Sequence, residues 1–238
     1  MKKIMTFMFT LILAIGCIFG LTACGGDKVK LIDIKLTDEE YGFVMKESNT
    51  ALKTSFDAYL AEIKENGEFD AIMAKYFEGV GEKTGYSYSG DGTSTITSDL
   101  KEADKFVVAT NCPFEPFEYI SDGKIYGVDM EIAAGYAAKH NLQLVIQNID
   151  FDAIFTALDA GYVDMGMAGV TESPERSSYL FTTHYYNASL QLIVAADNKD
   201  FDACATAKEV ENVFERVERK DHRISSGYDG RRLCKRIF

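Results

Sequence analysis

Residues 105–169 read KFVVATNCPFEPFEYISDGKIYGVDMEIAAGYAAKHNLQLVIQNIDFDAIFTALDAGYVDMGMAG. Short runs of apolar and β-branched residues alternate here with longer stretches of helical spacing. We expect strands at 106–109, 142–147 and 165–169, and helices at 129–140 and 151–160. Gly161 is a good stop for the second helix. This alternation with short connections predicts an α/β fold with a mostly parallel sheet flanked by helices.

The flanking segments extend the same pattern. Residues 31–36 and 41–45 read as strands, and Asp122-Gly123 reads as a hairpin turn. Thr50 can cap a helix that stops at Asn66-Gly67, and a second helix should follow at 68–77. Residues 79–98 are rich in Gly, Ser and Thr and predict a surface loop or linker. Residues 190–195 form the last apolar strand that we expect.

The N-terminus has the features of an export signal. Positive charge at Met1-Lys2-Lys3 precedes an apolar run, Ile4 to Phe19, that is short for a membrane span. The following LTAC, residues 21–24, resembles the lipobox of bacterial lipoproteins. This resemblance implies lipidation of Cys24 and a mature chain anchored by lipid on the extracytoplasmic face of the cell membrane.

Composition excludes several classes of protein. The 238 residues carry 37 acidic and 25 basic side chains, a formal net charge of -12, which disfavours binding to nucleic acid. Apart from Cys17 in the signal and Cys24, the cysteines are Cys112, Cys204 and Cys234, an odd number without CxxC spacing. The three histidines lie far apart in the sequence. We therefore expect no metal and no cofactor.

Three stretches carry a family resemblance: VVATNCPFEPFEY, GKIYGVDMEIAAGYAAKHNL and QNIDFDAIFTALDAGYVDMGMAGVTESPERSSYLFTTHYY. Their order and spacing resemble the first lobe of polar amino-acid binding proteins of ABC importers, the type II periplasmic-binding-protein fold. In that family, two α/β lobes close over a free amino acid. The resemblance implies a substrate-binding subunit that delivers its ligand to permease subunits, and no enzymatic activity.

A stretch earlier in the chain, EEYGFVMKESNTALKTSFDAYLAEIKENGEFDAIMAKYF, resembles the C-terminal end of the same family. Its position before the first lobe implies a circular permutation, which surface termini tolerate. The expected organisation is a signal peptide at 1–23, a tether at 24–30, a permuted element completing lobe one at 31–80, a linker at 81–103, lobe one at 104–200 and an aborted second lobe at 201–238.

The resemblance also assigns site residues. Phe114 and Phe151 match the aromatic rings that enclose the ligand side chain. Arg176 matches the arginine that grips the α-carboxylate with paired donors. Thr171 matches a hydroxyl that holds the ligand, and Ala168 and Gly169 are small enough to expose the main chain to it.

Ligand preference stays open. Asn111 lies where some binders of basic amino acids carry an aspartate, which puts a cationic ligand in doubt. Glu115 and Glu118 could compensate, but we interpret them as solvated loop carboxylates. Alternatives are a ligand-sensing surface module, a non-functional truncated remnant and, more remotely, a dehydratase of the same fold with an acid such as Glu172.

The C-terminal stretch departs from the family. Residues 215–238 contain eight Lys or Arg against four Asp or Glu, and we find no helical or strand period in them. A basic tail for anionic lipid is one interpretation. Reverse translation read one nucleotide later permits LNGLKGKITGSAAGTTGGGYVRG, which looks like the start of the second lobe. We therefore expect a frameshift from about residue 214, leaving one lobe and half of a site.

Overall fold

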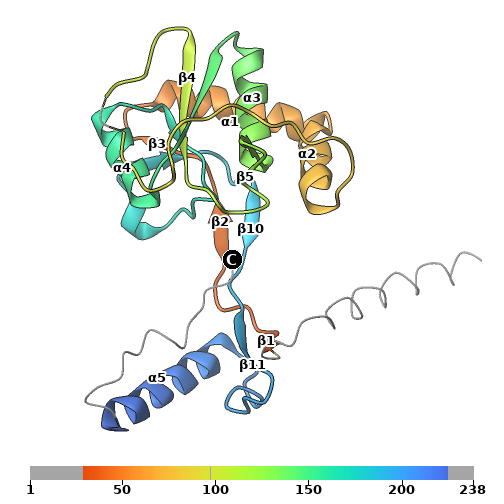
Figure 1. The fold of residues 1–238 in the computed structure, drawn as a ribbon, viewed down its shortest axis with the longest axis vertical. Helices are drawn as coiled ribbons and strands as arrows, with labels where there is room; N and C mark the ends of the chain where they lie inside the picture. The colour runs from red at the N-terminus through yellow and green to blue at the C-terminus, as the bar shows by residue number, and fades with distance from the viewer. Residues whose placement is uncertain (1–28, 97, 225–238) are drawn as a thin grey trace, which may run out of the picture. The chain divides into compact units, whose positions relative to one another are not determined.

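The computed structural model describes residues 29–96 and 98–224, which form two compact units (Figure 1). The larger unit comprises residues 37–190. The smaller unit combines residues 29–36 with the segment from residue 191 onward. The chain therefore passes between the units twice, at Leu36/Thr37 and at Leu190/Gln191.

The larger unit is built on a five-stranded sheet with the strand order β7-β4-β8-β3-β9. Strand β4 is parallel to both of its neighbours, whereas β3 is antiparallel to β8 and to β9. Four of the five strands therefore run in one direction. The strands are β3 (Val44–Lys46), β4 (Lys105–Thr110), β7 (Gln143–Asn148), β8 (Met165–Gly166) and β9 (Tyr179–Phe181).

Helices cover both faces of this sheet (Figure 1). Alternation along β4 directs Phe106 and Val108 into one apolar cluster and Val107 and Ala109 into another. Helices α1 and α3 pack in the first cluster, and α4 packs in the second. The helices are α1 (Thr50–Glu65), α2 (Glu68–Phe77), α3 (Val128–Lys139) and α4 (Phe151–Ala160). The predicted α/β fold with a mostly parallel sheet is confirmed.

The helix boundaries follow from local chemistry. Asp150 caps α4 by accepting a hydrogen bond from the amide of Asp152, and Gly161 ends that helix at a φ of 76°. Thr50 is the first residue of α1 rather than its cap, because Asn49 occupies the N-cap position. Asn49 makes no side-chain capping bond there.

Residues 37–80 form an integral part of the larger unit. Strand β3 lies between β8 and β9, and its Val44 and Met45 are fully buried. Helix α1 contributes Phe56, Leu60 and Ile63 to the same core as α3. Removing this segment would leave a gap inside the sheet rather than at its edge.

The segment between α2 and β4 has no helix or strand in its described part, yet it is attached to the larger unit. Tyr86 exchanges main-chain hydrogen bonds with Ile125, and Ser89 bridges to the end of β7. A Cβ on Gly90 would lie 2.1 Å from the main-chain oxygen of Asn148. A side chain cannot fit there, so glycine lets the segment run tightly along β7.

Two small antiparallel pairs complete the larger unit. Strands β5 (Tyr119–Ser121) and β6 (Lys124–Tyr126) form the expected hairpin around Asp122-Gly123. Strand β2 (Glu39–Tyr41) pairs with β10 (Tyr186–Ala188), so a segment before α1 lies beside one that follows β9. A short 3-10 helix, η1, spans Pro174–Arg176.

The smaller unit has its own apolar cluster. Strand β1 (Val29–Ile32) pairs antiparallel with β11 (Leu192–Ala195), and helix α5 (Ala207–Ile224) follows. The cluster contains Ile32, Leu192, Phe201, Val210 and Val213. This pairing moves two expected boundaries: residues 31–36 and 191–200 belong with the smaller unit rather than with lobe one.

Helix α5 also corrects the interpretation of the C-terminal stretch. Residues 215–224 are helical, although we found no period in them. The stretch is rich in Glu, Lys and Arg, which are good helix formers, and it continues the helical spacing of Val210 and Val213. Residues 225–238, including Cys234, lie outside the described part of the chain.

The expected signal and lipidation site, residues 1–23 and Cys24, also lie outside the described residues. Within residues 29–96 and 98–224, none of the helices combines the length and the apolar character needed to cross a bilayer.

Candidate functional site

The predicted site residues follow the carboxyl ends of parallel strands. Strand β4 ends at Thr110, β7 at Asn148 and β8 at Gly166. Because these three strands are parallel neighbours, the loops that follow them emerge at one edge of the sheet. Ligands of open α/β sheets bind at such an edge. The loops carry Asn111, Phe114, Phe151, Ala168, Gly169, Thr171 and Arg176.

Arg176 is held in place by its own loop and by two aromatic rings. Its Nη1 donates a 2.7 Å hydrogen bond to the main-chain oxygen of Thr171. The guanidinium carbon lies 5.6 Å from the ring centroid of Phe151 and 5.2 Å from that of Phe155. The contact with Thr171 uses one of the five N–H donors of a guanidinium. Arg176 is therefore a half-buried, oriented donor group rather than a freely moving surface cation.

Thr171 lies beside strand β2. Its hydroxyl donates to the carboxylate of Glu39 over 3.3 Å, and its main chain forms a bridge with Tyr41. The next amide, that of Glu172, donates to the main-chain oxygen of Glu40. Strand β2 thus supports the turn that carries the hydroxyl.

Gly169 adopts a φ of +52° directly against an aromatic ring. A Cβ on this residue would lie 2.3 Å from Cε1 of Phe114. Both the backbone conformation and the close ring require glycine. Ala168 is buried, so the small residues at 168 and 169 let the loop after β8 pack tightly below Phe114.

The amide of Asn111 joins two neighbouring loops. Its Nδ2 donates to the main-chain oxygen of Ile149 at 2.5 Å and to that of Gly92 at 3.1 Å. Asn148, at the end of β7, also connects to the loop after β4, because its Oδ1 accepts a hydrogen bond from the main-chain amide of Cys112. Both N–H donors of Asn111 are therefore engaged within the protein.

The two aromatic candidates belong to different clusters. The ring of Phe114 stacks on Phe117, with centroids 5.5 Å apart, and packs with the cluster on the α1 and α3 side of the sheet. Phe151 opens α4, contacts Phe155 edge to face and packs with the cluster on the other side. Phe114 and Phe151 thus approach the edge of the sheet from opposite faces.

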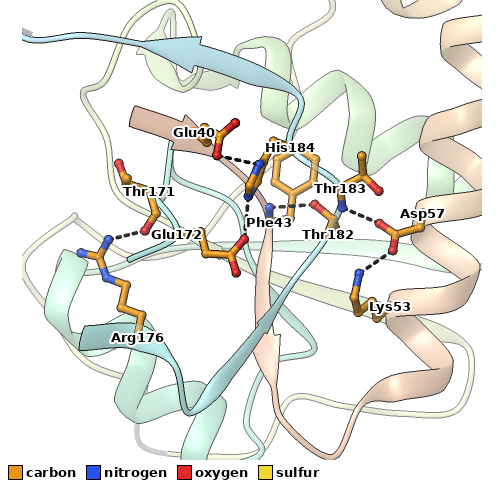
Figure 2. A network of polar contacts seen from close by, with 10 residues as sticks. All are labelled: Glu40, Phe43, Lys53, Asp57, Thr171, Glu172, Arg176, Thr182, Thr183 and His184. Atoms are coloured by element: carbon orange, nitrogen blue, oxygen red, sulfur yellow. Dashed lines mark hydrogen bonds and ion pairs between the residues drawn. The ribbon is translucent and has the colours of Figure 1, made fainter. Parts of the chain in front are cut away.

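A network of polar contacts connects the turn at Thr171 and Glu172 to strand β2 and helix α1 (Figure 2). His184 lies between two carboxylates, with Nε2 at 2.6 Å from Glu172 and Nδ1 at 3.3 Å from Glu40. The segment that carries His184 is fixed by the amide of Thr183, which donates to Asp57 on α1 over 2.6 Å. We did not anticipate this network, because its members lie far apart in the sequence.

Sequence reasoning was wrong about Glu118. Glu118 is not a solvated loop carboxylate; its side chain is completely buried, as is that of Asp129. Burial and the adjacent Asp129 raise the pKa of Glu118 well above its usual range. Burial also raises the pKa of Asp129 to about 7, and this effect outweighs the hydrogen bonds from the hydroxyl of Tyr185 and the amide of Gly169, which act to lower that pKa. Glu115, in contrast, is exposed.

A second concavity lies elsewhere on the sheet. This open cavity of about 460 Å³ is lined by the start of α1 and the start of β4, and so lies away from the carboxyl ends of the strands. Its lysines already have acidic partners: Lys101 lies 3.2 Å from Asp164, and Lys105 lies 2.5 Å from Glu102. The edge that carries Arg176 is the better candidate for ligand binding.

Residues 106–226, just over half of the chain, match the family described as bacterial extracellular solute-binding proteins, family 3. The chain belongs to this family. It is 33% identical over 95 residues to the arginine-binding extracellular protein ArtP of Bacillus subtilis, a match that covers 40% of this chain and 37% of that protein. It is 32% identical over 105 residues to the arginine-binding protein ArgT of Corynebacterium glutamicum, covering 44% of this chain and 34% of that protein.

Among solved structures, the chain is similar to the amino acid ABC transporter substrate-binding protein AbpA of Streptococcus pneumoniae bound to L-arginine. The identity is 37%, the match covers 31% of this chain and 33% of that chain, and the TM-score is 0.29. The chain thus spans well under half of the length of the two curated relatives named above.

Proposed function

We propose that this chain is the amino-acid-binding component of an ABC importer, and that the edge of the sheet at Arg176 binds the ligand. The observation that carries this proposal is the orientation of Arg176 by the main chain of Thr171 and the ring of Phe155. A guanidinium fixed in this way can offer a planar pair of donors to a carboxylate. Membership of the solute-binding family supports the same assignment.

The ligand that we propose is a free polar amino acid. Its α-carboxylate would bind Arg176, and its side chain would lie between Phe114 and Phe151. The hydroxyl of Thr171 and the main chain at Ala168 and Gly169 would complete this half of the site. Relatives named as arginine-binding make L-arginine the first ligand to test. Asn111 in place of an acid makes L-glutamine the second.

We further propose that the larger unit is one lobe of the binding protein in permuted order. Residues 37–80 complete the sheet from the N-terminal side, and the family match begins only at residue 106. The smaller unit holds a two-stranded sheet and α5 in its described part. We interpret it as the beginning of the second lobe, altered by a frameshift near codon 214. Sequencing the gene past that codon tests this, because an adjacent frame should continue as a second lobe.

For the cellular setting, we propose lipid attachment at Cys24 on the extracytoplasmic face, with permease subunits as the partners and no catalytic step. Metabolic labelling with a radioactive fatty acid tests the anchor. The label should enter the wild-type chain and be absent from Cys24→Ser. Labelling of the variant at the wild-type level would contradict the proposal.

Ligand binding is tested by NMR titration of the full chain in detergent micelles with L-arginine, L-histidine and L-glutamine. We expect at least one of these to shift the resonances of Gly169 and Thr171. Arg176→Gln should abolish the shifts. The matched control is Arg216→Gln, an exposed arginine on α5, which should leave them unchanged. No shift with any of the three ligands, or an equal loss in both variants, would refute the proposed site.

A further inference from the structure

Two carboxyl groups lie buried next to the candidate site, and neither has a cationic partner among the residues that the structure describes. The side chains of Glu118 and Asp129 are each 0% exposed. Neither forms an ion pair within the described residues, and both carboxyl oxygens of Glu118 are without a hydrogen-bond partner there. Burying two adjacent negative charges without a cation is costly, so the pair must hold a proton near neutral pH.

Asp129 is the member of the pair that connects to the site. Its Oδ1 accepts a 2.7 Å hydrogen bond from the hydroxyl of Tyr185, and its Oδ2 accepts one from the amide of Gly169 at 3.2 Å. The amide of Gly169 belongs to the turn whose next residues present Thr171 and orient Arg176. Asp129, the second residue of α3, is thus one hydrogen bond away from the proposed ligand contacts.

The groups that surround the pair are acids and neutral donors. Burial raises the pKa of both Tyr41 on β2 and Tyr185 before β10, and the negative charges of the two carboxyls raise it further. Cys112, after β4, interacts with Glu118, and burial raises the pKa of its thiol to about 12. These three groups therefore stay neutral at physiological pH, so that among the groups of this cluster only the two carboxyls titrate between pH 5 and 8.

We propose that Asp129 is a positioning residue for the ligand-binding turn, and that its protonation releases the amide of Gly169. The role at the ligand rests on the proposed function, whereas the coupling of Asp129 to Gly169 does not. A carboxylate accepts a hydrogen bond more strongly than a carboxylic acid does, so the ionised form holds the turn more firmly. Ligand binding should accordingly weaken as the pH falls below neutrality.

The contacts also decide which member of the pair keeps the proton. Asp129 receives two hydrogen bonds that favour its ionised form, whereas Glu118 receives none from the described residues. Near neutral pH, Glu118 is therefore the neutral acid and Asp129 is the group that titrates. Replacing Glu118 by glutamine mimics its neutral form and should leave the titration of Asp129 in place.

The test uses the full chain in detergent micelles, labelled with carbonyl-13C alanine and 15N glycine. An Ala-Gly sequence occurs at three places, so the spectrum selected for this pair should contain Gly135, Gly161 and Gly169. We expect the amide of Gly169 to shift between pH 5 and 8.5 with a midpoint near 7. Gly135 in α3 and Gly161 after α4 serve as internal controls that should not follow this curve.

Three variants separate the possibilities. Asp129→Asn should abolish the titration of Gly169, Glu118→Gln should preserve it, and Tyr185→Phe should raise its midpoint by about one pH unit, because a donor to the carboxylate is lost. Persistence of the curve in Asp129→Asn, or its loss in Glu118→Gln alone, overturns the proposal. If Asp129→Asn does not fold, an unchanged midpoint in Tyr185→Phe overturns it instead.

A ligand titration on the same samples tests the positioning role. Affinity for L-arginine should be lower at pH 5.5 than at pH 8 in the wild type, and this pH dependence should disappear in Asp129→Asn. Binding that is equal at both pH values overturns the positioning role. Absence of binding at every pH refutes the proposed function and, with it, the role of Asp129 in positioning the ligand contacts. A titration curve of Gly169 that depends on Asp129 would in that case still establish the coupling between these two residues.

Discussion

The ring of Phe114 lies directly against the α-carbon of Gly169, so close that a methyl group on the glycine would lie 2.3 Å from the ring edge. This contact joins the loop after β4 to the loop after β8. The contact is so tight that no side chain larger than that of glycine fits at position 169 without moving the ring.

Gly169→Ala should therefore destabilise the larger unit by about 2 kcal/mol or more, through a positive φ together with displacement of Phe114. Gly67→Ala is the matched control, because Gly67 has a φ of +84° but no atom within 4 Å of its would-be Cβ. We expect it to cost only about 1 kcal/mol, from backbone strain alone. Urea denaturation measures both. Equal losses would mean that the ring contact contributes nothing.

The stability of the chain should depend on pH in the direction set by its buried acids. Glu118 and Asp129 have raised pKa values in the folded state, so they are protonated more readily there than in the unfolded chain. The free energy of unfolding that these two acids contribute is therefore fully present below their pKa in the unfolded chain, about 4. It is lost as the pH rises towards 7 and beyond, because the unfolded chain releases its protons more readily. We expect the urea midpoint to fall between pH 5 and pH 8.

Glu118→Gln provides the control for this trend, because it removes one of the two acids and should flatten the curve. Acids with lowered pKa values, such as Asp202 and Glu209, are ionised in both states above about pH 5 and do not contribute in this window. A urea midpoint that rises from pH 5 to pH 8 would contradict our assignment.

Glu131 should be essential for docking α2. Its carboxylate lies 2.5 Å from Nζ of Lys75 and accepts from the hydroxyl of Tyr76 at 2.8 Å, so a residue of α3 holds two of α2. Since Glu131 is only 8% exposed, Glu131→Ala should cost about 3 kcal/mol by leaving both partners unsatisfied. Glu65→Ala, at an exposed position at the end of α1, should change stability by less than about 0.5 kcal/mol. Thermal unfolding followed by circular dichroism compares the two.

The proposed half-site should bind its ligand weakly. With contacts from one lobe only, we expect a dissociation constant for L-arginine weaker than about 1 μM, corresponding to less than about 8 kcal/mol of binding free energy. Isothermal titration calorimetry on the full chain measures it. A submicromolar value would show that the described units suffice for tight binding and that our account of a missing lobe is wrong.

Local pattern predicted much of the larger unit. The alternation from Phe106 to Ala109, the helical spacing from Phe151 to Ala160 and the stop at Gly161 appear where the sequence indicated them. Each of these depends on neighbours within one or two turns of chain. The 3-10 helix η1, which we did not predict, is equally local, because it begins at Pro174 and ends at Arg176, and so the arginine is oriented by its own loop.

Pairings between distant segments were not readable in this way. The partner of β1 is β11, about 160 residues later in the chain, which moves residues 31–36 out of the unit to which we had assigned them. Likewise, β2 pairs with β10, and His184 meets Glu40 only because of that arrangement. A strand's own residues specify which face is apolar but not which other strand completes its hydrogen bonds.

By itself, the sequence determined the α/β class, the helices and strands that carry the loops, and the residue types that suit a carboxylate ligand. The tertiary structure alone decided that Glu118 is buried beside Asp129 and that Asp129 reaches the amide of Gly169. The physical reason is that the ionisation of a carboxyl group depends on the solvent and charges within a few ångströms. Here those surroundings are assembled from Tyr41, Asp129 and Tyr185, which only the folded chain brings together.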